Sequence, residues 1–251
     1  MFSIFKNEQE LAKELSLELY KSIESNPKII LGLATGSTML PVYQEFINLY
    51  NNNPLDLSSI TTFNLDEYIG LDPKHNQSYN YFMQENLFKH LPTLNISNTH
   101  LPLGNCEDVN KQCLEYNELI KKSGGIDIQL LGIGGNGHIG FNEPKTPFSS
   151  TTHVVELTEK TKIDNGRFFE DINEVPSEAI TMGLSEINEA KKVYLVITGK
   201  HKAQIVKKLY DSEITEDLPA SILKNHPNVS IYLDSQAASL LPQDVQKELL
   251  R

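Results

Sequence analysis

Short apolar runs alternate along the chain with longer stretches in which apolar residues recur every three or four positions. The short runs are bounded by glycine, proline or polar residues, as is typical of strands buried on both faces. They predict strands at residues 28–34, 60–65, 99–101, 126–131, 154–157, 193–198 and 229–233. The longer stretches have helical spacing, and they predict helices at residues 8–25, 41–49, 79–90, 107–122, 200–210 and 235–249.

This alternation predicts an α/β fold: a mostly parallel, doubly wound (Rossmann-like) sheet with helices on both faces. We find no internal repeat and no linker, so residues 1–251 are expected to form a single domain. Ligands of such sheets bind at the carboxyl ends of the strands. The loops that follow the strands are therefore the places to look for chemistry.

A glycine-rich stretch at residues 130–144 follows one predicted strand. It contains a literal G-x-G-x-x-G at Gly132, Gly134 and Gly137. A dinucleotide loop also needs a helix that begins inside the glycines. Prolines follow at once and no helical period appears before Thr151, so this pattern argues against a nicotinamide site.

The same stretch carries Asn136, His138 and Glu143 within eight residues. His138 can exchange a proton with a substrate oxygen near neutral pH. Glu143 can orient the imidazole ring or favour its protonated, positively charged form. The spacing is not that of a zinc motif and no second histidine lies nearby, so no metal is expected. The alternative is an ordinary glycine turn with a surface histidine.

Two further loops carry candidate groups. Asp66 and Glu67 follow the strand at residues 60–65, and adjacent carboxylates repel, which favours Asp66 as a base with a raised pKa. The alternative is that either acid caps the next turn or faces solvent. Residues 34–38, Ala-Thr-Gly-Ser-Thr, end the first strand before a predicted helix and suit a phosphate, or else form a simple helix cap.

Positive charge for a phosphate has three candidate sources near strand ends: Arg167, Lys200 and Lys202. The alternative for each of them is an ordinary surface charge in contact with solvent, which is the more common role of Lys and Arg.

The formal net charge of −11 argues against nucleic acid and anionic membranes as partners. The absence of a long apolar segment or a signal-peptide pattern favours the cytoplasm. Cys106 and Cys113 are expected in one helix, reduced.

These motifs together resemble those of the glucosamine-6-phosphate deaminase family. The resemblance is carried by residues 34–38, 62–71, 78–79, 131–144, 167–169, 175–176 and 202–203. It implies conversion of D-glucosamine 6-phosphate and water to D-fructose 6-phosphate and ammonia, in the catabolism of amino sugars such as N-acetylglucosamine and sialic acid. It also implies a small sugar phosphate as the partner and no metal or redox cofactor.

The resemblance implies roles for individual residues as well. Asp66 would be the enolisation base and His138 the ring-opening acid and base, helped by Asn136 and Glu143. The phosphate-binding residues that it implies, by side chain or backbone, are Thr35, Gly36, Ser37, Thr38, Arg167 and Lys202.

The sequence departs from the family pattern at two places. Some members have Asp where this chain has Asn136, which can act only through hydrogen bonds. Hexameric members activated by N-acetylglucosamine 6-phosphate have basic residues at the positions of His153 and Val155, together with a longer tail. The departure predicts a non-allosteric enzyme that is a monomer or a small homo-oligomer.

Two other classes of protein remain as alternatives. A 6-phosphogluconolactonase-like hydrolase would share the fold without needing the Asp66-Glu67 loop. A sugar-phosphate-sensing domain of a transcription regulator would carry a basic helix-turn-helix, and the acidic first 30 residues contain none.

Overall fold

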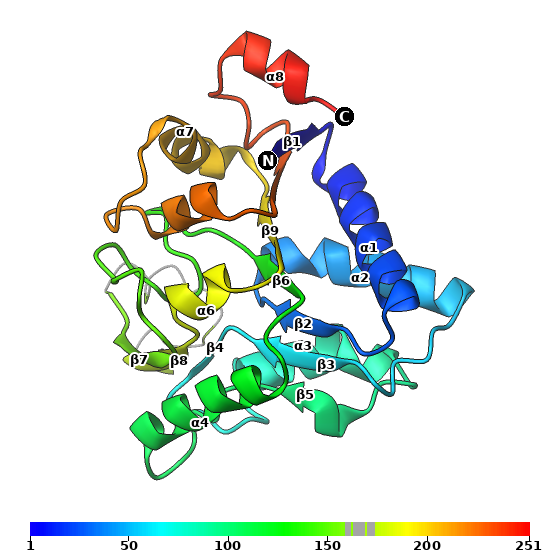
Figure 1. The fold of residues 1–251 in the computed structure, drawn as a ribbon, viewed down its shortest axis with the longest axis vertical. Coiled ribbons are helices and arrows are strands. Elements are labelled where there is room, and N and C mark those ends of the chain that lie inside the picture. Colours follow the sequence, from blue (N-terminus) through cyan, green and yellow to red (C-terminus); the bar gives the residue numbers. More distant parts are fainter. Residues whose placement is uncertain (159–161, 163–168, 170–173) are drawn as a thin grey trace.

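The computed structural model describes residues 1–158, 162, 169 and 174–251. Within this part of the chain, a seven-stranded parallel sheet has the order β1, β10, β9, β6, β2, β3, β5 (Figure 1). Its strands are β1 (Phe2–Phe5), β2 (Ile30–Leu33), β3 (Thr61–Asn64), β5 (Thr99–His100), β6 (Ile128–Leu131), β9 (Lys192–Ile197) and β10 (Val229–Asp234). The predicted parallel sheet is confirmed.

Helices connect the strands. The α-helices are α1 (Glu8–Ser25), α2 (Leu40–Asn52), α3 (Tyr79–Asn86), α4 (Val109–Lys122), α6 (Leu184–Asn188), α7 (Ala203–Asp211) and α8 (Gln243–Leu249). Short 3₁₀ segments are η1 (Ser37–Met39), η2 (Phe88–His90), η3 (Ile96–Asn98), η5 (Lys200–Lys202) and η6 (Pro219–Asn225).

The helices cover both faces of the sheet. Glu18 of α1 accepts hydrogen bonds from the hydroxyls of Tyr194 and Tyr232, so α1 lies on the face to which these tyrosines point. Phe63 lies in register with Gly32, Gln129 and Val193, and therefore faces the other way. Tyr116 of α4 packs edge-on against Phe63 with ring centroids 5.8 Å apart. The predicted two-sided cover is confirmed.

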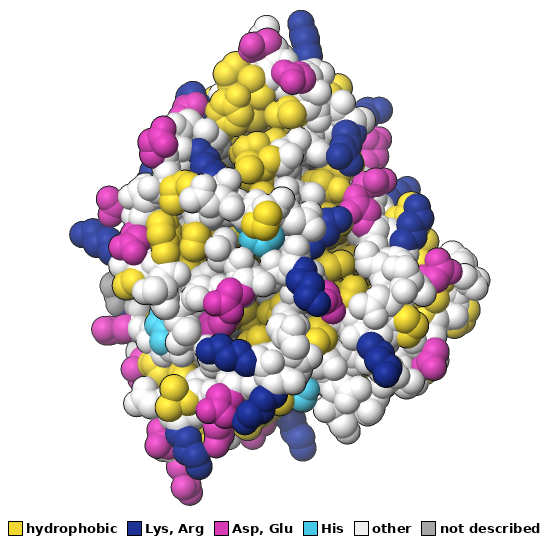
Figure 2. Space-filling view, viewed as in Figure 1, with side chains coloured by type: hydrophobic (Ala, Val, Ile, Leu, Met, Phe, Trp, Pro, Cys, Tyr) yellow, Lys and Arg dark blue, Asp and Glu magenta, His cyan; other side chains and the backbone are white. Residues whose placement is uncertain are grey.

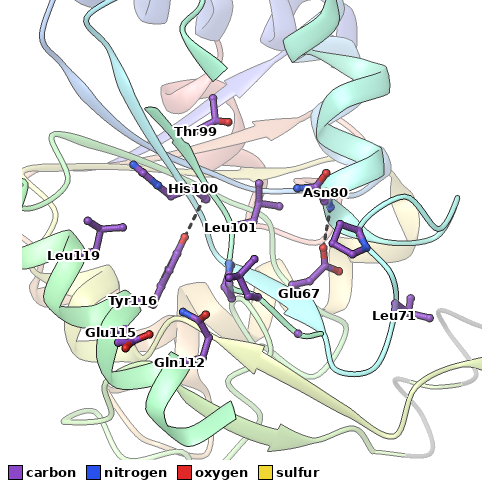
Figure 3. A pocket seen from close by; sticks show the side chains of 14 residues that line it. Glu67, Leu71, Asn80, Thr99, His100, Leu101, Gln112, Glu115, Tyr116 and Leu119 are labelled. Atoms are coloured by element: carbon purple, nitrogen blue, oxygen red, sulfur yellow. Dashed lines mark hydrogen bonds between the residues drawn. The ribbon is translucent and has the colours of Figure 1, made fainter. Parts of the chain in front are cut away.

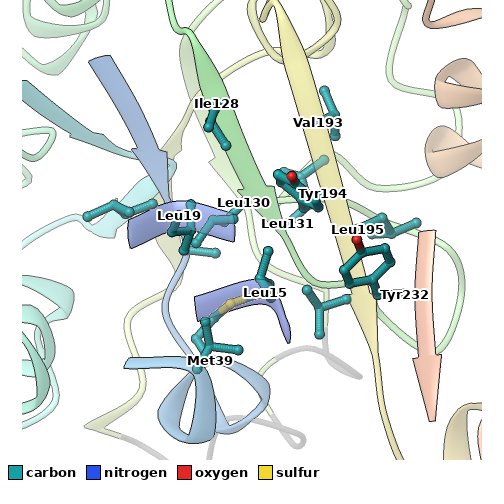
Figure 4. Packing of buried hydrophobic residues seen from close by; sticks show 14 of the residues in the cluster. Leu15, Leu19, Met39, Ile128, Leu130, Leu131, Val193, Tyr194, Leu195 and Tyr232 are labelled. Carbon is teal, nitrogen blue, oxygen red and sulfur yellow. The ribbon is translucent and has the colours of Figure 1, made fainter. Parts of the chain in front are cut away.

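The core lies between the sheet and these helices. Figure 4 shows Leu15 and Leu19 of α1 beside Leu130 and Tyr194 of the central strands. After Lys192 the side chains of β9 are almost fully buried, which explains why Val193 to Ile197 are apolar at consecutive positions rather than at alternate ones.

A second, three-stranded antiparallel sheet stands beside the first. It consists of β4 (Asp66–Tyr68), β8 (Glu178–Thr181) and β7 (His153–Glu156) in that order. Leu65 joins the two sheets, because its N–H donates to Leu33 O (3.2 Å) and its carbonyl accepts from Met182 N (2.6 Å). The chain therefore passes from β3 into β4 with a one-residue bend.

Two predicted elements differ in part from the structure. The strand predicted at residues 154–157 is confirmed as β7, which lies in the antiparallel sheet. The helix predicted at residues 235–249 was wrong over its first half and is confined to α8, because Pro242 stands at its start and Asp234 caps a turn at Ala237 N (2.7 Å). Asp108 caps α4 at Lys111 N, so Cys106 precedes the helix and only Cys113 lies in it. Both cysteines are free thiols.

The surface carries charges of both signs. On the face seen in Figure 2, Lys and Arg side chains are interspersed with Asp and Glu, and the described side chains form no continuous basic surface there. None of the helices in the described part of the chain is long and apolar enough to cross a membrane.

Candidate active site

The glycine-rich loop after β6 folds into a tight turn without a helix. Gly134 N donates to His138 O (2.9 Å), and Gly137 N donates to Gly134 O (3.0 Å). The His138 ring packs against the backbone of Gly134, where a Cβ would lie 2.1 Å from its Cε1 atom. No helix begins between β6 and β7, a segment that the structure describes throughout, so the prediction that no helix starts inside the glycines is confirmed.

The structure brings Asn136, His138 and Glu143 together. Glu143 Oε1 lies 3.6 Å from His138 Nδ1, and the two side chains are 19% and 22% exposed. The Asn136 amide donates to Glu143 Oε2 (2.5 Å), while its Oδ1 accepts from His138 N (3.2 Å). Asn136 therefore links the carboxylate to the backbone that carries the imidazole, and the ring retains access to solvent or substrate.

Strand β8, which the sequence reasoning missed, anchors this loop. Thr181 Oγ1 accepts from Phe141 N (3.1 Å), and the amide of the fully buried Asn142 donates to Met182 O (2.8 Å). Asn142 thus has a structural role, because its amide ties the histidine loop to the end of β8. The run Ala179-Ile-Thr-Met182 is short and apolar, a strand signal that could have revealed β8.

Asp66 lies in β4 beside β8, directly opposite Thr181. A Cβ on Gly140 would meet Thr181 Oγ1 at 2.9 Å and Asp66 Oδ2 at 3.6 Å, so Gly140 brings the histidine loop against the Asp66 carboxylate. Burial raises the pKa of Asp66 to about 8, with the neighbouring charge of Glu67 as the second cause. No hydrogen bond from the described residues opposes this shift.

Glu67 points to the opposite side of β4 and has a different task. Its Oε1 accepts from Tyr68 N and Tyr79 N (both 2.9 Å), and its Oε2 accepts from Asn80 N (2.8 Å). Desolvation raises the pKa of Glu67, and these three N–H donors oppose that shift. The capping role that was left open for either acid therefore falls to Glu67, at the start of α3.

Two strand-end loops of similar form flank β6. After β2, Gly36 (φ +96°) leads into η1 and α2, and after β9, Gly199 (φ +88°) leads into η5 and α7. Thr35 and Thr38 are half-buried, whereas Gly36 and Ser37 are exposed. Since β9, β6 and β2 are neighbours in the sheet, both helix starts present backbone N–H groups to one edge, an arrangement that suits an anion.

Lys202 connects one of these loops to the glycine-rich turn. Its Nζ donates to Ile133 O (2.7 Å), which places a positive charge between the carboxyl ends of β6 and β9. Asp234, which the sequence reasoning missed, holds the Gly199 N–H with both carboxylate oxygens (3.0 and 3.1 Å). Arg167 lies outside the described residues. Lys200 is exposed.

A cavity of about 480 Å³ lies behind β4 (Figure 3). Its walls are formed by Glu67 and Asn80, the chain at residues 99–104, and α4 from Gln112 to Leu119. His138 is not among its lining residues. The cavity therefore touches the back of the Asp66 strand rather than the histidine loop.

The parallel sheet, the two glycine loops at its strand ends and the adjacent carboxylate and histidine are typical of an α/β enzyme of small-molecule metabolism. The chain belongs to the family of glucosamine-6-phosphate isomerases/6-phosphogluconolactonase, whose model matches residues 6–231. Two curated relatives are glucosamine-6-phosphate deaminases. The one from Thermoanaerobacter pseudethanolicus is 49% identical over 97% of this chain and 96% of its own. The one from Staphylococcus aureus strain RF122 is 47% identical over 93% and 91%.

Solved structures give the same family. A monomeric glucosamine-6-phosphate deaminase is similar with a TM-score of 0.92 and 42% identity, over 96% of this chain and 98% of that one. The 6-phosphogluconolactonase of Trypanosoma brucei has a TM-score of 0.74 and 18% identity, over 96% and 98%. The second likeness concerns the fold alone.

Proposed function

We propose that this enzyme converts D-glucosamine 6-phosphate and water to D-fructose 6-phosphate and ammonia. The observation that carries the proposal is the position of Asp66 Oδ2 next to Gly140, two residues beyond His138. A buried carboxylate with a raised pKa and a histidine paired with Glu143 supply two separate proton-transfer groups at one place. The named relatives support the same reaction.

The reaction needs both groups in sequence. His138 moves a proton that opens the pyranose to its aldehyde, while Glu143 and Asn136 hold the imidazole. Asp66 then takes the proton from C2 and returns it to C1, which leaves an iminium at C2. Water adds to this carbon and ammonia leaves, so the keto group of fructose 6-phosphate forms without any net oxidation.

The phosphate is held at the other end of the site. We assign it to the backbone and hydroxyls of Thr35, Gly36, Ser37 and Thr38, with Lys202 as the cation and Arg167 as a second one. The Gly36 loop at the start of a 13-residue helix and the place of Lys202 beside Ile133 support this assignment. Binding energy from the phosphate fixes the sugar for the proton transfers at its other end.

The enzyme acts in the cytoplasm as a monomer or small homo-oligomer, without allosteric activation. The similarity to a monomeric deaminase supports the assembly state. The lack of Arg or Lys at positions 153 and 155 of β7, which are His153 and Val155, supports the absence of allosteric activation. Rate curves with and without N-acetylglucosamine 6-phosphate test the proposal. A sigmoidal curve that this compound makes hyperbolic would contradict it.

Purified enzyme is given glucosamine 6-phosphate, and ammonia and fructose 6-phosphate are measured together. The proposal expects both products in equal amounts, and the Asp66→Asn variant is expected to bind the substrate without turnover. Hydrolysis of 6-phosphogluconolactone with no ammonia release would favour the hydrolase. Sugar-phosphate binding without either reaction would favour a sensing domain.

A further inference from the structure

We propose that Glu67 is a positioning residue, which ties β4 to the start of α3. In this way it holds Asp66 in place together with the aromatic wall beside it, which consists of the rings of Tyr68, Tyr79 and Phe141. The inference deepens the proposed function and rests on Asp66 being the enolisation base. Nothing in the reaction itself requires a second carboxylate at this position, because Glu67 points away from Asp66 and from the histidine loop.

The contacts of Glu67 are unusually complete for a carboxylate. It is 5% exposed, and its two oxygens accept three backbone N–H groups, one from its own strand and two from the first turn of α3. Figure 3 shows the bond from Asn80. Ser78 caps the same helix at Tyr81 N (3.0 Å). Glu67 is therefore the group that fixes α3 to β4, through charge-assisted hydrogen bonds.

The helix start carries a side chain that leads back to the catalytic loop. The Tyr79 ring stacks on Phe141 with centroids 6.1 Å apart and an interplanar angle of 13°, and it also packs against Tyr68 (4.9 Å). Phe141 follows Gly140, the residue that lies against Asp66. A displaced α3 would thus shift both the wall and the loop that define the position of Asp66.

Charge adds a second effect. Ionised Glu67 raises the pKa of Asp66, and among the residues that the structure describes, Tyr79 of α3 and Tyr116 of α4 also interact electrostatically with Asp66. Both tyrosines stay protonated because burial raises their pKa values further. Removing the charge of Glu67 therefore lowers the pKa of Asp66, and the acid limb of the rate profile should move to lower pH.

Two variants separate position from charge. Glu67→Gln removes the charge and turns one acceptor oxygen into a donor that faces an N–H group, whereas Glu67→Asp keeps the charge but shortens the reach by one methylene. We expect kcat to fall about tenfold or more in both, since small displacements of reacting groups are costly. KM should stay within about twofold because the phosphate loops are untouched. The acid limb should move only in Glu67→Gln.

Glu115→Gln is the matched control. Glu115 lines the same cavity, but it is 60% exposed and forms an ion pair with the exposed Lys111 (3.6 Å), so its replacement should change neither kcat nor the acid limb. The titration of Asp66 is followed in parallel by ¹³C NMR of its side-chain carboxyl, which needs no substrate.

The outcomes divide clearly. If Glu67→Gln keeps the wild-type kcat, or lowers thermal stability alone with an unmoved Asp66 titration, Glu67 has no positioning role. If the wild-type enzyme releases no ammonia, the proposed function fails, and the ring ¹H resonances of Tyr79 and Phe141 in the charge-keeping Glu67→Asp still decide the inference. Shifted resonances of both rings support it, and unchanged resonances overturn it.

Discussion

Replacing Asp66 by Asn should make the protein more stable while abolishing turnover. At low pH the Asp66 carboxyl is protonated in both folded and unfolded chains. As the pH rises from the ordinary pKa of 3.8 toward about 8, the unfolded chain loses its proton first, so folding stability falls across this window. At ~1.4 kcal/mol per pKa unit, the cost reaches an upper limit of ~4 kcal/mol at pH 7.

The asparagine side chain of the Asp66→Asn variant resembles the protonated carboxyl and avoids this cost. We expect about half of the limit to be realised, because buried sites relax around a charge. For a chain of this length the gain of ~2 kcal/mol corresponds to a rise in Tm of about 4–8 °C at pH 7. At pH 4 the carboxyl is neutral in the folded state and about 60% ionised in the unfolded chain, so the gain should fall to at most ~0.6 kcal/mol there.

Thermal melts of both proteins between pH 4 and pH 8 measure this difference, and ammonia release measures turnover. The exposed Asp217→Asn is the control, which should show no gain that grows with pH. A stability difference that is equal at pH 4 and pH 8 would refute the raised pKa of Asp66. Retained turnover in Asp66→Asn would refute its role as the base.

Three further changes probe the same architecture. Gly140→Ala places a Cβ 2.9 Å from Thr181 Oγ1, at a backbone position with a left-handed conformation (φ +57°). We expect this variant to lose at least ~1 kcal/mol of stability and to have a lower kcat, and a wild-type Tm and rate would contradict this. Lys145 has a left-handed backbone (φ +78°) in the turn that Thr146 N closes on Glu143 O, and glycine adopts this conformation without strain. The Tm of Lys145→Gly should therefore rise by about 2–4 °C without loss of kcat, and a fall in Tm would contradict the strain. Lys202→Ala should raise KM at least about tenfold, whereas the exposed Lys200→Ala should not, and equal KM values in a steady-state assay would contradict the phosphate assignment.

Much of the fold was predictable because its strands are buried on both faces. Continuous apolar runs such as residues 193–197 mark such strands clearly, and β9 covers the whole of that run. The prediction missed β1, β8 and α6. A strand of the same length, β2, was found because it lies within a longer apolar run. At residues 235–249 the apolar residues mimic a helix, but Asp234 and Pro242 impose a turn instead.

The site, like the fold, was predictable from the sequence only in part. The sequence placed Asp66, Asn136, His138 and Glu143 in loops at strand ends. Because the carboxyl ends of parallel strands share one edge, these side chains were expected near one another. The structure brings the last three into contact. It could not separate the tasks of Asp66 and Glu67, which are adjacent in the chain. Their separation depends on the bend at Leu65, which starts a new strand whose alternating side chains face opposite sides.

By itself, the sequence determined the parallel sheet, the glycine turn that excludes a dinucleotide and the residue types available for proton transfer. These properties are local, because strand burial, turn geometry and side-chain chemistry follow from neighbouring residues. Only the tertiary structure decided which carboxylate is buried beside the histidine loop and which one caps a helix. That choice depends on β8, more than 100 residues further along the chain than Asp66, which pairs with β4 and anchors the loop of His138 at the same time.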